Sequence, residues 1–273
     1  MASEVKARAA GQTSIAKAYR DRVEIRGFDL CDELIGHIGF TEYFLVLLMG
    51  RKPDPVLSKL VDATLVAIAE HGLVPSVQAA RMTYTAAPNA LQGGVAAGLL
   101  GCGPVILGAA GASGEMLRGI IATVDQGEEL EAVCREALTA LRENKQAVPG
   151  FGHPLHKPED PRAWRLIEYA QELGAASRHI EALLMIHKCL PDSFGRALPL
   201  NVSGGIAATL LDGGFPPEVL MGVPLLARTA GLLGHLLEEQ QQPIGFKLAN
   251  GAEGEIEYVP LESNLASASE RSA

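Results

Sequence analysis

The sequence lacks the excess of basic residues that a nucleic-acid-binding surface needs. It carries 23 lysines and arginines against 32 aspartates and glutamates, which gives a net charge of −9 at pH 7. A protein that follows a phosphate backbone presents a basic face instead. We therefore exclude nucleic acid as a partner, although a local cationic pocket for a small anion is compatible with this balance.

Cysteines are few and scattered. Cys31, Cys102, Cys134 and Cys189 show no Cys-x-x-Cys spacing and have no cluster of histidines beside them. A zinc site needs its ligands at short, regular spacing, and no other set of metal ligands stands out. The amino-terminal residues are polar and lack the apolar stretch of a secretory signal. We expect a cytoplasmic protein with reduced thiols and no metal.

Strand signals are also scarce. Aromatic residues make up 5% of the chain, and alternating β-branched runs joined by hairpin turns are missing. Alanine and leucine recur at helical spacing instead, which predicts an all-α protein. The clearest predicted helices cover residues 58–71, 130–145, 162–177 and 217–240. Residues 241–260 have the glycine and proline punctuation of an extended arm that could reach a partner subunit.

Charge is absent from Met82 to Gly114, a run long enough to raise the question of a membrane span. The same run contains Asn89, Gln92, two prolines and many glycines. This composition favours small-residue helices that pack closely inside a bundle or a dimer interface. We therefore expect no membrane partner.

The densest punctuation lies in the stretch VPGFGHPLHKPEDPR, from Val148 to Arg162. His153 follows two glycines, where the backbone can approach a ligand closely and an imidazole can donate to a developing oxyanion. An equally good interpretation is that His153 caps the next helix.

The end of this stretch predicts the start of a helix, with Asp160 as N-cap and proline in the first turn. Arg162 then lies in the first turn, where the helix dipole disfavours a cation unless it binds an anion. A carboxylate ligand would supply that anion. The alternative is an exposed Arg162 that pairs with Glu159 or Glu168.

This stretch resembles the GFGH…DPR signature of the citrate synthase superfamily. Other segments are similar to family motifs in the same order, and the resemblance covers about residues 20 to 260. They are IRGFDLCDELIGHIGFTEYFLVLLMGRKP (25–53), AEHGLVPSVQAAR (69–81), LPLNVSGGIAATLLDGGFPPE (198–218) and LLARTAGLLGHLLEE (225–239). Because full citrate synthases are longer at the amino terminus, the chain resembles the short citryl-CoA lyase branch and the matching module of ATP-citrate lyase.

The resemblance implies an all-α fold with two helical domains and an intertwined dimer or higher oligomer. The large domain would comprise residues 1–129 and 201–260. The small domain would comprise residues 130–200, carry the GFGH loop and close over a cleft that holds His153. Residues 261–273 are predicted to form a disordered tail.

The resemblance also implies roles for individual residues. His153 would contact the oxaloacetate carbonyl or the hydroxyl proton of a citryl thioester. His71 would contact the same dicarboxylate, and Arg162 and Arg228 would bind its carboxylates. Lys157 would lie near the phosphates of coenzyme A. The adenine of coenzyme A would contact the backbone of Val148, Gly150, Phe151 and Gly152. Taken alone, His71 beside Gly72 could instead cap a helix C-terminus, and Arg228 could form a structural ion pair.

Two catalytic residues of the family pattern are missing. The family's first histidine falls at Ile106 or Leu107, and its aspartate falls at Ser203, whose hydroxyl cannot abstract a proton without a base of its own. His156 in the same loop is the first candidate replacement. Weaker candidates are Asp212, expected at a helix end, Glu115, and His235, expected to face solvent or a dimer partner.

These observations predict a citrate synthase-like enzyme that cleaves or forms a carbon–carbon bond between an acyl-CoA and an oxo acid. Coenzyme A thioesters would be substrates and no metal would be required. The alternative is a catalytically impaired or regulatory acyl-CoA-binding homologue. Turnover would distinguish an enzyme from a protein that only binds.

Overall fold

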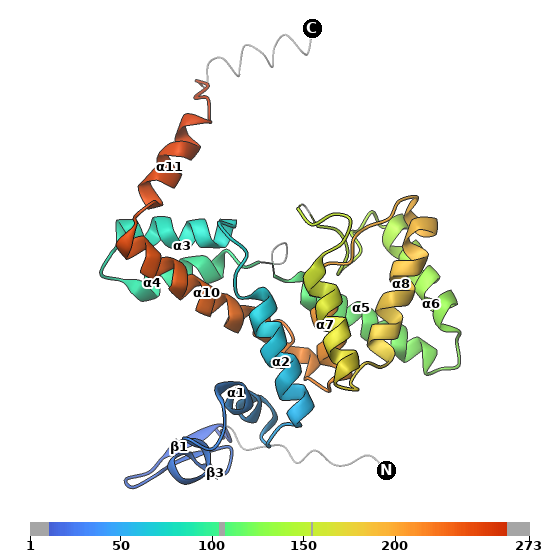
Figure 1. Cartoon of the computed structure of the whole chain (residues 1–273), viewed down its shortest axis with the longest axis horizontal. Coiled ribbons are helices and arrows are strands. Elements are labelled where there is room, and N and C mark those ends of the chain that lie inside the picture. The colour runs from blue at the N-terminus through green and yellow to red at the C-terminus, as the bar shows by residue number, and fades with distance from the viewer. Residues whose placement is uncertain (1–10, 104–106, 154, 261–273) are drawn as a thin grey trace. The chain divides into compact units, whose positions relative to one another are not determined.

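The computed structural model describes residues 11–103, 107–153 and 155–260, and helices make up most of this part of the chain (Figure 1). The expected all-α fold is confirmed. The chain divides into two compact units, which are described separately. The first comprises Met1–Ile68 and Pro104–Leu226, and the second comprises Ala69–Gly103 and Ala227–Ala273. These two units do not coincide with the large and small domains that the resemblance implies, and that domain division remains a prediction. The predicted tail lies outside the described residues.

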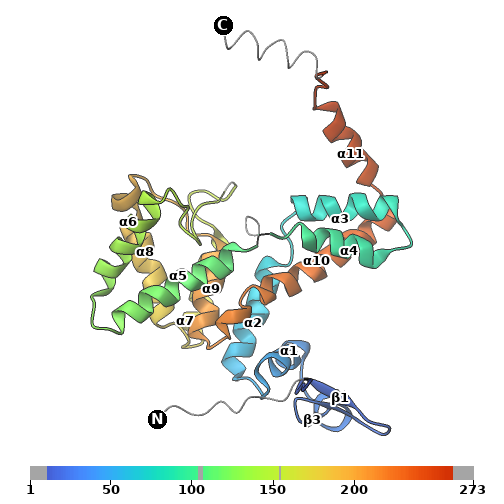
Figure 2. The same cartoon turned by 180° about the vertical axis from the view of Figure 1, so that it is seen from behind.

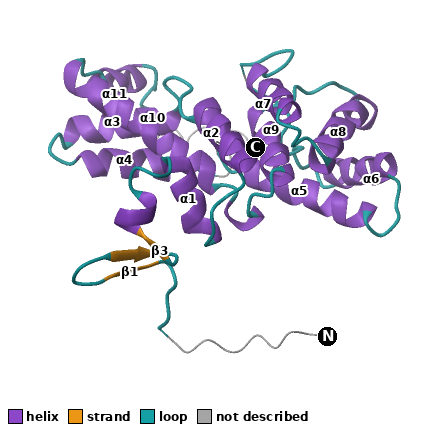
Figure 3. Ribbon diagram, turned by 60° about the horizontal axis from the view of Figure 1, so that its bottom comes forward, coloured by secondary structure: helices purple, strands orange, loops and turns teal. Residues whose placement is uncertain are grey.

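The first unit begins with a small antiparallel sheet, drawn as arrows in Figure 3, that the sequence did not predict. Its strands are β1 (Ala16–Ala18), β2 (Val23–Ile25) and β3 (Phe28–Asp29), with Ala16 paired to Ile25 and Ile25 paired to Phe28. Each strand is two or three residues long, too short to show alternation. Arg26 and Gly27 form the turn with φ of 52° and 89°, as a two-residue hairpin requires.

The helices of the first unit follow this sheet. They are the π-helical turn η1 (Leu30–Leu34), α1 (Phe40–Met49), α2 (Pro55–Ile68), α5 (Ala109–Val124), α6 (Leu130–Glu143), α7 (Pro161–Glu172), α8 (Arg178–Phe194), α9 (Val202–Asp212), the 3-10 turn η2 (Pro217–Val219) and the start of α10 (Gly222–Gln241). Every residue of α9 from Val202 to Leu211 is buried. Helices α5, α7 and α8 pack around it (Figure 2), so α9 forms the centre of this unit.

The second unit is built from α3 (Pro75–Ala86), α4 (Leu91–Leu100), the rest of α10 and α11 (Gly245–Gly254). Its core contains Val77, Ala80, Tyr84, Leu232 and Leu236. A Cβ atom added at Gly98 would lie 2.6 Å from the Leu232 side chain. The glycines of the uncharged run therefore permit close helix packing, as expected.

The arm expected at residues 241–260 contains the helix α11 instead of extended chain. The Glu239 carboxylate accepts from the backbone N–H groups of Ile244 at 2.9 Å and Gly245 at 2.7 Å. It thus satisfies donors that a helix start leaves unpaired. This cap comes from a neighbouring helix, so the segment's own punctuation did not reveal it.

One stretch of the described chain, Pro217–Gln241, is long and apolar enough to cross a membrane by length and composition alone. Leu232 and Leu236 in it are fully buried in the core of the second unit. The core helix of a soluble protein passes the same test. The uncharged run itself supplies a short apolar helix, Leu91–Leu100.

Candidate functional site

The glycine-rich half of the Val148–Arg162 stretch is fixed by backbone hydrogen bonds to residues 199–201. The N–H of Gly152 donates to Pro199 O at 2.7 Å, and the N–H of Asn201 donates to Gly150 O at 3.0 Å. Asn201 Nδ2 also donates to Gly152 O at 2.9 Å. These bonds hold the backbone in front of His153 against the start of the buried helix α9.

Gly150 requires its missing side chain. Its φ is +84°, and a Cβ atom there would lie 2.8 Å from both Gly204 Cα and Ser113 Oγ. Gly152 has a similar φ of +87° but no atom within 4 Å of such a Cβ. Gly150 therefore lets the loop cross α5 and α9 closely, whereas Gly152 serves the backbone conformation alone.

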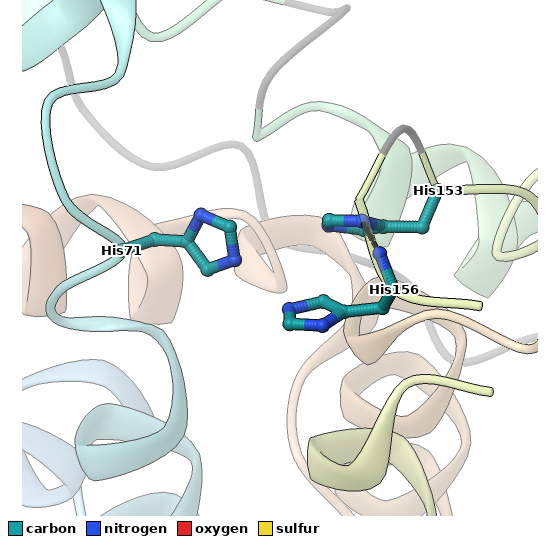
Figure 4. A group of neighbouring side chains, drawn as sticks. All are labelled: His71, His153 and His156. Carbon is teal, nitrogen blue, oxygen red and sulfur yellow. Dashed lines mark hydrogen bonds between the residues drawn. The ribbon is translucent and has the colours of Figure 1, made fainter.

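His153 has its ring orientation set by its own loop (Figure 4). Its Nδ1 accepts from the backbone N–H groups of Leu155 at 3.1 Å and His156 at 2.9 Å. A neutral imidazole that accepts at Nδ1 carries its proton at Nε2, so Nε2 is a hydrogen-bond donor. The alternative role as a helix cap is wrong, because Asp160 caps α7.

His156 places a second imidazole beside the first. The ring centroids of His153 and His156 lie 4.4 Å apart with an interplanar angle of 34°. Both side chains are partly buried. Two imidazole rings therefore occupy the same end of the loop.

Arg162 pairs with the carboxylate that caps its own helix. Its Nε lies 3.0 Å from Asp160 Oδ1 and its Nη2 lies 2.9 Å from Asp160 Oδ2. Both alternatives considered from the sequence, Glu159 and Glu168, are wrong. The Arg162 side chain is 19% exposed and Asp160 is fully buried, so the pair stands at the edge of the first unit's interior.

Asp160 also joins this helix to α9, because its Oδ2 accepts from the Val202 N–H at 3.0 Å. Burial acts to raise the pKa of Asp160. The hydrogen bonds from Arg162 and Val202 outweigh burial and hold that pKa below its usual range. The carboxylate is therefore charged at neutral pH and keeps Arg162 in one orientation.

Ser203 lies in the first turn of α9. Its N–H donates to Asn201 Oδ1 at 3.0 Å, and the residue is 9% exposed. Leu107, one of the two residues at the missing histidine position, is buried at 3% exposure. Ile106 lies outside the described residues. No carboxylate or imidazole stands at either Ser203 or Leu107 to do the work of the family residues.

The residues expected to bind coenzyme A occupy both halves of the loop. Lys157 is exposed, while the side chains of Val148 and Phe151 are buried. Gly150 and Gly152 carry the positive φ values given above. What these residues bind stays a prediction.

His71 and Arg228 belong to the second unit. Helix α2 ends at Ile68, and His71 follows in the segment before α3, where its N–H donates to Glu70 Oε1 at 2.8 Å. The imidazole of His71 is also labelled in Figure 4. The alternative of a helix C-cap fails because two residues separate His71 from the helix end.

Arg228 on α10 is 2% exposed, and its Nε and Nη1 are buried with no hydrogen-bond partner among the residues that the structure describes. The alternative of a structural ion pair finds no partner in that part of the chain. An unpaired buried guanidinium is costly. It is the kind of group that an anionic ligand would satisfy.

The weaker candidate replacements are held in structural contacts. Asp212 ends α9 and accepts from His179 Nδ1 at 2.8 Å and from the first N–H groups of α8, which confirms a helix-terminal role. Of the two expected environments of His235, solvent is wrong, because its Nε2 lies 2.9 Å from Glu70 Oε2 and its side chain is 15% exposed; the dimer partner stays a prediction. Glu115 is exposed on α5.

Comparison with known proteins agrees with this architecture. The family model "Citrate synthase, C-terminal domain" matches residues 3–246, and the chain belongs to the citrate synthase family. Citrate synthase from Synechocystis is 26% identical over 240 residues, which are 84% of this chain and 57% of the relative. Citrate synthase from Deinococcus radiodurans is 30% identical over 202 residues, which are 72% of this chain and 52% of the relative. The chain thus spans about half the length of the curated relatives it matches.

Solved structures give the same result over a larger share of the chain. Citryl-CoA lyase from Hydrogenobacter thermophilus superposes with a TM-score of 0.81 and 29% identity, covering 92% of this chain and 95% of that one. ATP citrate lyase from Methanosaeta concilii, solved with (3S)-citryl-CoA, has a TM-score of 0.75 at 20% identity and covers 96% of this chain and 44% of that one. The latter likeness concerns the fold.

Proposed function

We propose that the protein is an enzyme that cleaves or forms a carbon–carbon bond between an acyl-CoA and an oxo acid, with citryl-CoA as the first substrate to test. The observation that carries this proposal is His153, whose Nε2 is made a donor by two backbone N–H groups at Nδ1. A fixed donor can stabilise charge that develops on a carbonyl oxygen. The likeness to a citryl-CoA lyase, which covers nearly the whole length of both chains, supports the choice of substrate.

In the condensation direction His153 Nε2–H would donate to the carbonyl oxygen of the oxo acid, which becomes the hydroxyl of the product. Cleavage is the reverse: the hydroxyl proton returns to His153, the carbon–carbon bond breaks, and the electron pair passes to the thioester enolate, whose carbon then takes up a proton to give the acyl-CoA. Ser203 cannot exchange a proton at that carbon without help. We assign that exchange to His156, whose ring adjoins His153.

The carboxylates of the substrate are assigned to arginines. Asp160 engages Nε and Nη2 of Arg162, so Nη1 is directed to a second anion. Arg228 has two buried nitrogens that a carboxylate would satisfy, and a planar guanidinium binds carboxylate in two-point fashion. His71 is assigned to the same dicarboxylate on the resemblance alone.

Coenzyme A is the expected carrier of the acyl group. Lys157 is an exposed cation in the loop, and Lys commonly binds phosphate as a point charge. The backbone of residues 148–152 is proposed to contact the adenine. We further propose a soluble, cytoplasmic protein that needs no metal.

The decisive experiment mixes the purified protein with citryl-CoA and follows oxaloacetate by its NADH-coupled reduction. We expect turnover in the wild type and a loss of at least about a hundredfold in His153→Gln, since general acid–base groups contribute about 10² to 10⁴-fold. His37→Ala is the matched control, because His37 is an exposed histidine outside the loop. Equal activity in His153→Gln would refute the assignment of His153.

A second function is favoured by the buried Leu107 and by Ser203 at the positions of the missing acid and base. It is an acyl-CoA-binding or regulatory homologue without turnover. Calorimetric titration with coenzyme A and citryl-CoA separates the two functions. If the protein binds these ligands in a Lys157-dependent way but releases no oxaloacetate, it is a binding protein and the proposed enzymatic function is wrong.

A homodimer or higher oligomer is proposed from the small-residue helices of the second unit. Leu91 on α4 and Leu233 and Leu237 on α10 are large apolar residues at 41%, 44% and 56% exposure. Exposed apolar side chains of this size mark a surface that another chain can cover. Sedimentation equilibrium of the wild type and of Leu237→Glu measures the state. A monomer at micromolar concentration would contradict this proposal.

A further inference from the structure

Four residues in contact with one another support the loop that carries His153. One lies on α7, one lies on α8, and the other two lie on either side of His153 in the loop. Glu159 Oε2 accepts from Trp164 Nε1 at 2.9 Å, and Glu159 Oε1 lies 3.5 Å from His187 Nε2. The His187 ring also stacks on Phe151, with centroids 6.0 Å apart and planes inclined by 15°. These four residues, Phe151, Glu159, Trp164 and His187, are called the support cluster below.

His187 contacts both ends of the loop at once. Phe151 precedes His153 by two residues, and Glu159 follows it by six. Trp164 stands edge-on to the same imidazole, with centroids 5.7 Å apart and an angle of 69°. One ring on α8 therefore fixes the spacing between the segment that enters the loop and the segment that leaves it.

The hydrogen bond within the cluster satisfies a polar group that half-burial would leave unpaired. An indole N–H needs a partner when its ring is packed in a protein, and Glu159 provides it. The His187 and Glu159 side chains are 28% and 39% exposed, so their pairing contributes little energy by itself. The cluster therefore acts mainly by holding the two ends of the loop in position.

We infer that His187 is a positioning residue that acts on His153 through Phe151 and Glu159. No atom of His187 needs to touch a substrate for this role. Misplacement of a reacting group by about 1 Å can cost about 10²-fold in rate. Loss of His187 should therefore lower kcat much more than it changes KM. This kinetic part of the inference rests on the proposed function, but the effect on the loop does not.

The first test measures backbone hydrogen exchange in the full-length protein. His187→Ala removes both the stack on Phe151 and the 3.5 Å contact with Glu159, while His187→Phe keeps the stack and loses the contact. We expect exchange in residues 150–160 to be about tenfold faster in His187→Ala and intermediate in His187→Phe, since local opening follows local contacts. The remaining helices should be unchanged.

The matched control is His179→Ala on the same helix. His179 also pairs with a carboxylate, Asp212 at 2.8 Å, but it lies at the start of α8, eight residues before His187. Its loss should speed exchange at the start of α8 and leave residues 150–160 unchanged. Equal exchange of the loop in the two alanine variants would overturn the inference.

The second readout uses the chain's single tryptophan. Because Trp164 donates to Glu159 and contacts His187, its fluorescence should shift in His187→Ala and not in His179→Ala. Where the wild type turns over citryl-CoA, His187→Ala should lower kcat by about 10- to 100-fold with KM within about threefold of wild type. If the wild type has no activity, the proposed function fails, and the exchange comparison still decides the role of His187.

Discussion

Asp160 and Arg162 form a two-point ion pair across a single helix start, with Arg162 Nε 3.0 Å from Oδ1 and Nη2 2.9 Å from Oδ2. Oδ1 also accepts from the backbone N–H of Arg162 at 3.1 Å, so one carboxylate both caps α7 and orients its arginine. The stretch Asp160-Pro161-Arg162 thus starts the helix and orients the arginine with a single carboxylate. Asp160 holds Nε and Nη2, which leaves Nη1 for the carboxylate that we propose Arg162 binds.

Asp160→Asn should be strongly destabilising. The amide nitrogen cannot accept from the donors that now surround the carboxylate, and Arg162 loses its buried counter-charge. Breaking a partly buried pair from one side costs about 3–5 kcal/mol. Urea unfolding at pH 7 measures the change, with Asp192→Asn as the control because Asp192 is an exposed partner of Arg135. A loss below about 1 kcal/mol would mean that the pair contributes no more than a surface salt bridge.

Arg228→Met should raise stability and weaken ligand binding together. The guanidinium is buried, and two of its nitrogens have no partner in the described part of the chain. Replacing a buried charged group by an apolar one of similar volume is often stabilising by about 1–4 kcal/mol. If Arg228 binds a substrate carboxylate, the same change should weaken that binding by about 2–5 kcal/mol.

The two effects of Arg228→Met are measured separately, by urea unfolding without ligand and by calorimetric titration with citryl-CoA. The opposite signs make the test specific, because a structural arginine would lose stability on replacement. Arg142→Met is the control, since Arg142 is an arginine on α6 that donates to Ser193 O at the surface. Lower stability in Arg228→Met would contradict the role in ligand binding.

Gly150→Ala and Gly152→Ala separate steric crowding from backbone conformation. Both glycines have positive φ, so each alanine should cost about 1–2 kcal/mol in strain. Only at Gly150 would the new Cβ meet other atoms, at 2.8 Å from Gly204 Cα and Ser113 Oγ. Overpacking of this kind adds about 1–3 kcal/mol.

The comparison of the two glycine variants is made by thermal and urea unfolding of the full chain. Gly150→Ala should be the less stable variant by the overpacking amount. Equal losses would show that α5 and α9 move apart without cost. In that case the close crossing at Gly150 would not be what fixes the loop.

The sequence predicted the features of this fold that are encoded locally. The start of α7 follows from Asp160 and Pro161, and α6 begins at Leu130 as predicted. Helix α7 ends earlier than predicted, at Glu172, because Gly174 adopts a φ of +68°. Caps and helical periodicity act within a few residues, so a single sequence reveals them.

Features that depend on contacts between separate elements were missed. The cap of α11 comes from Glu239 on the preceding helix, and the partner of His235 is Glu70, far away in the sequence. The support of the loop by His187 likewise joins residues 28 positions or more apart. Among the candidate site residues, the loop and its arginine were predicted from one motif. The partner of Arg162 was not, because the capping pattern predicts the backbone contacts of Asp160 and not those of its second oxygen.

Acid should weaken the second unit through Glu239. Its carboxylate accepts from Arg81 Nε at 2.6 Å, Thr85 Oγ1 at 2.6 Å and two backbone N–H groups of α11. Burial acts to raise the pKa of Glu239, but these hydrogen bonds together outweigh it and lower the pKa from 4.5 to about 2. A folded-state pKa below the unfolded value stabilises the fold above the unfolded value, and this stability is lost as pH falls from about 4.5 towards 2.

A shift of this size corresponds to about 3 kcal/mol at neutral pH. Urea unfolding at pH 7, 4.5 and 3 should show stability falling through that window in the wild type. Glu239→Gln should be less stable at pH 7, because Arg81 at 2% exposure loses its buried counter-charge, and its stability should fall less with acid. Glu238→Gln is the matched control, since Glu238 also pairs with Arg81 but is 55% exposed. Parallel pH profiles for the wild type and Glu239→Gln would show that other carboxylates cause the acid sensitivity.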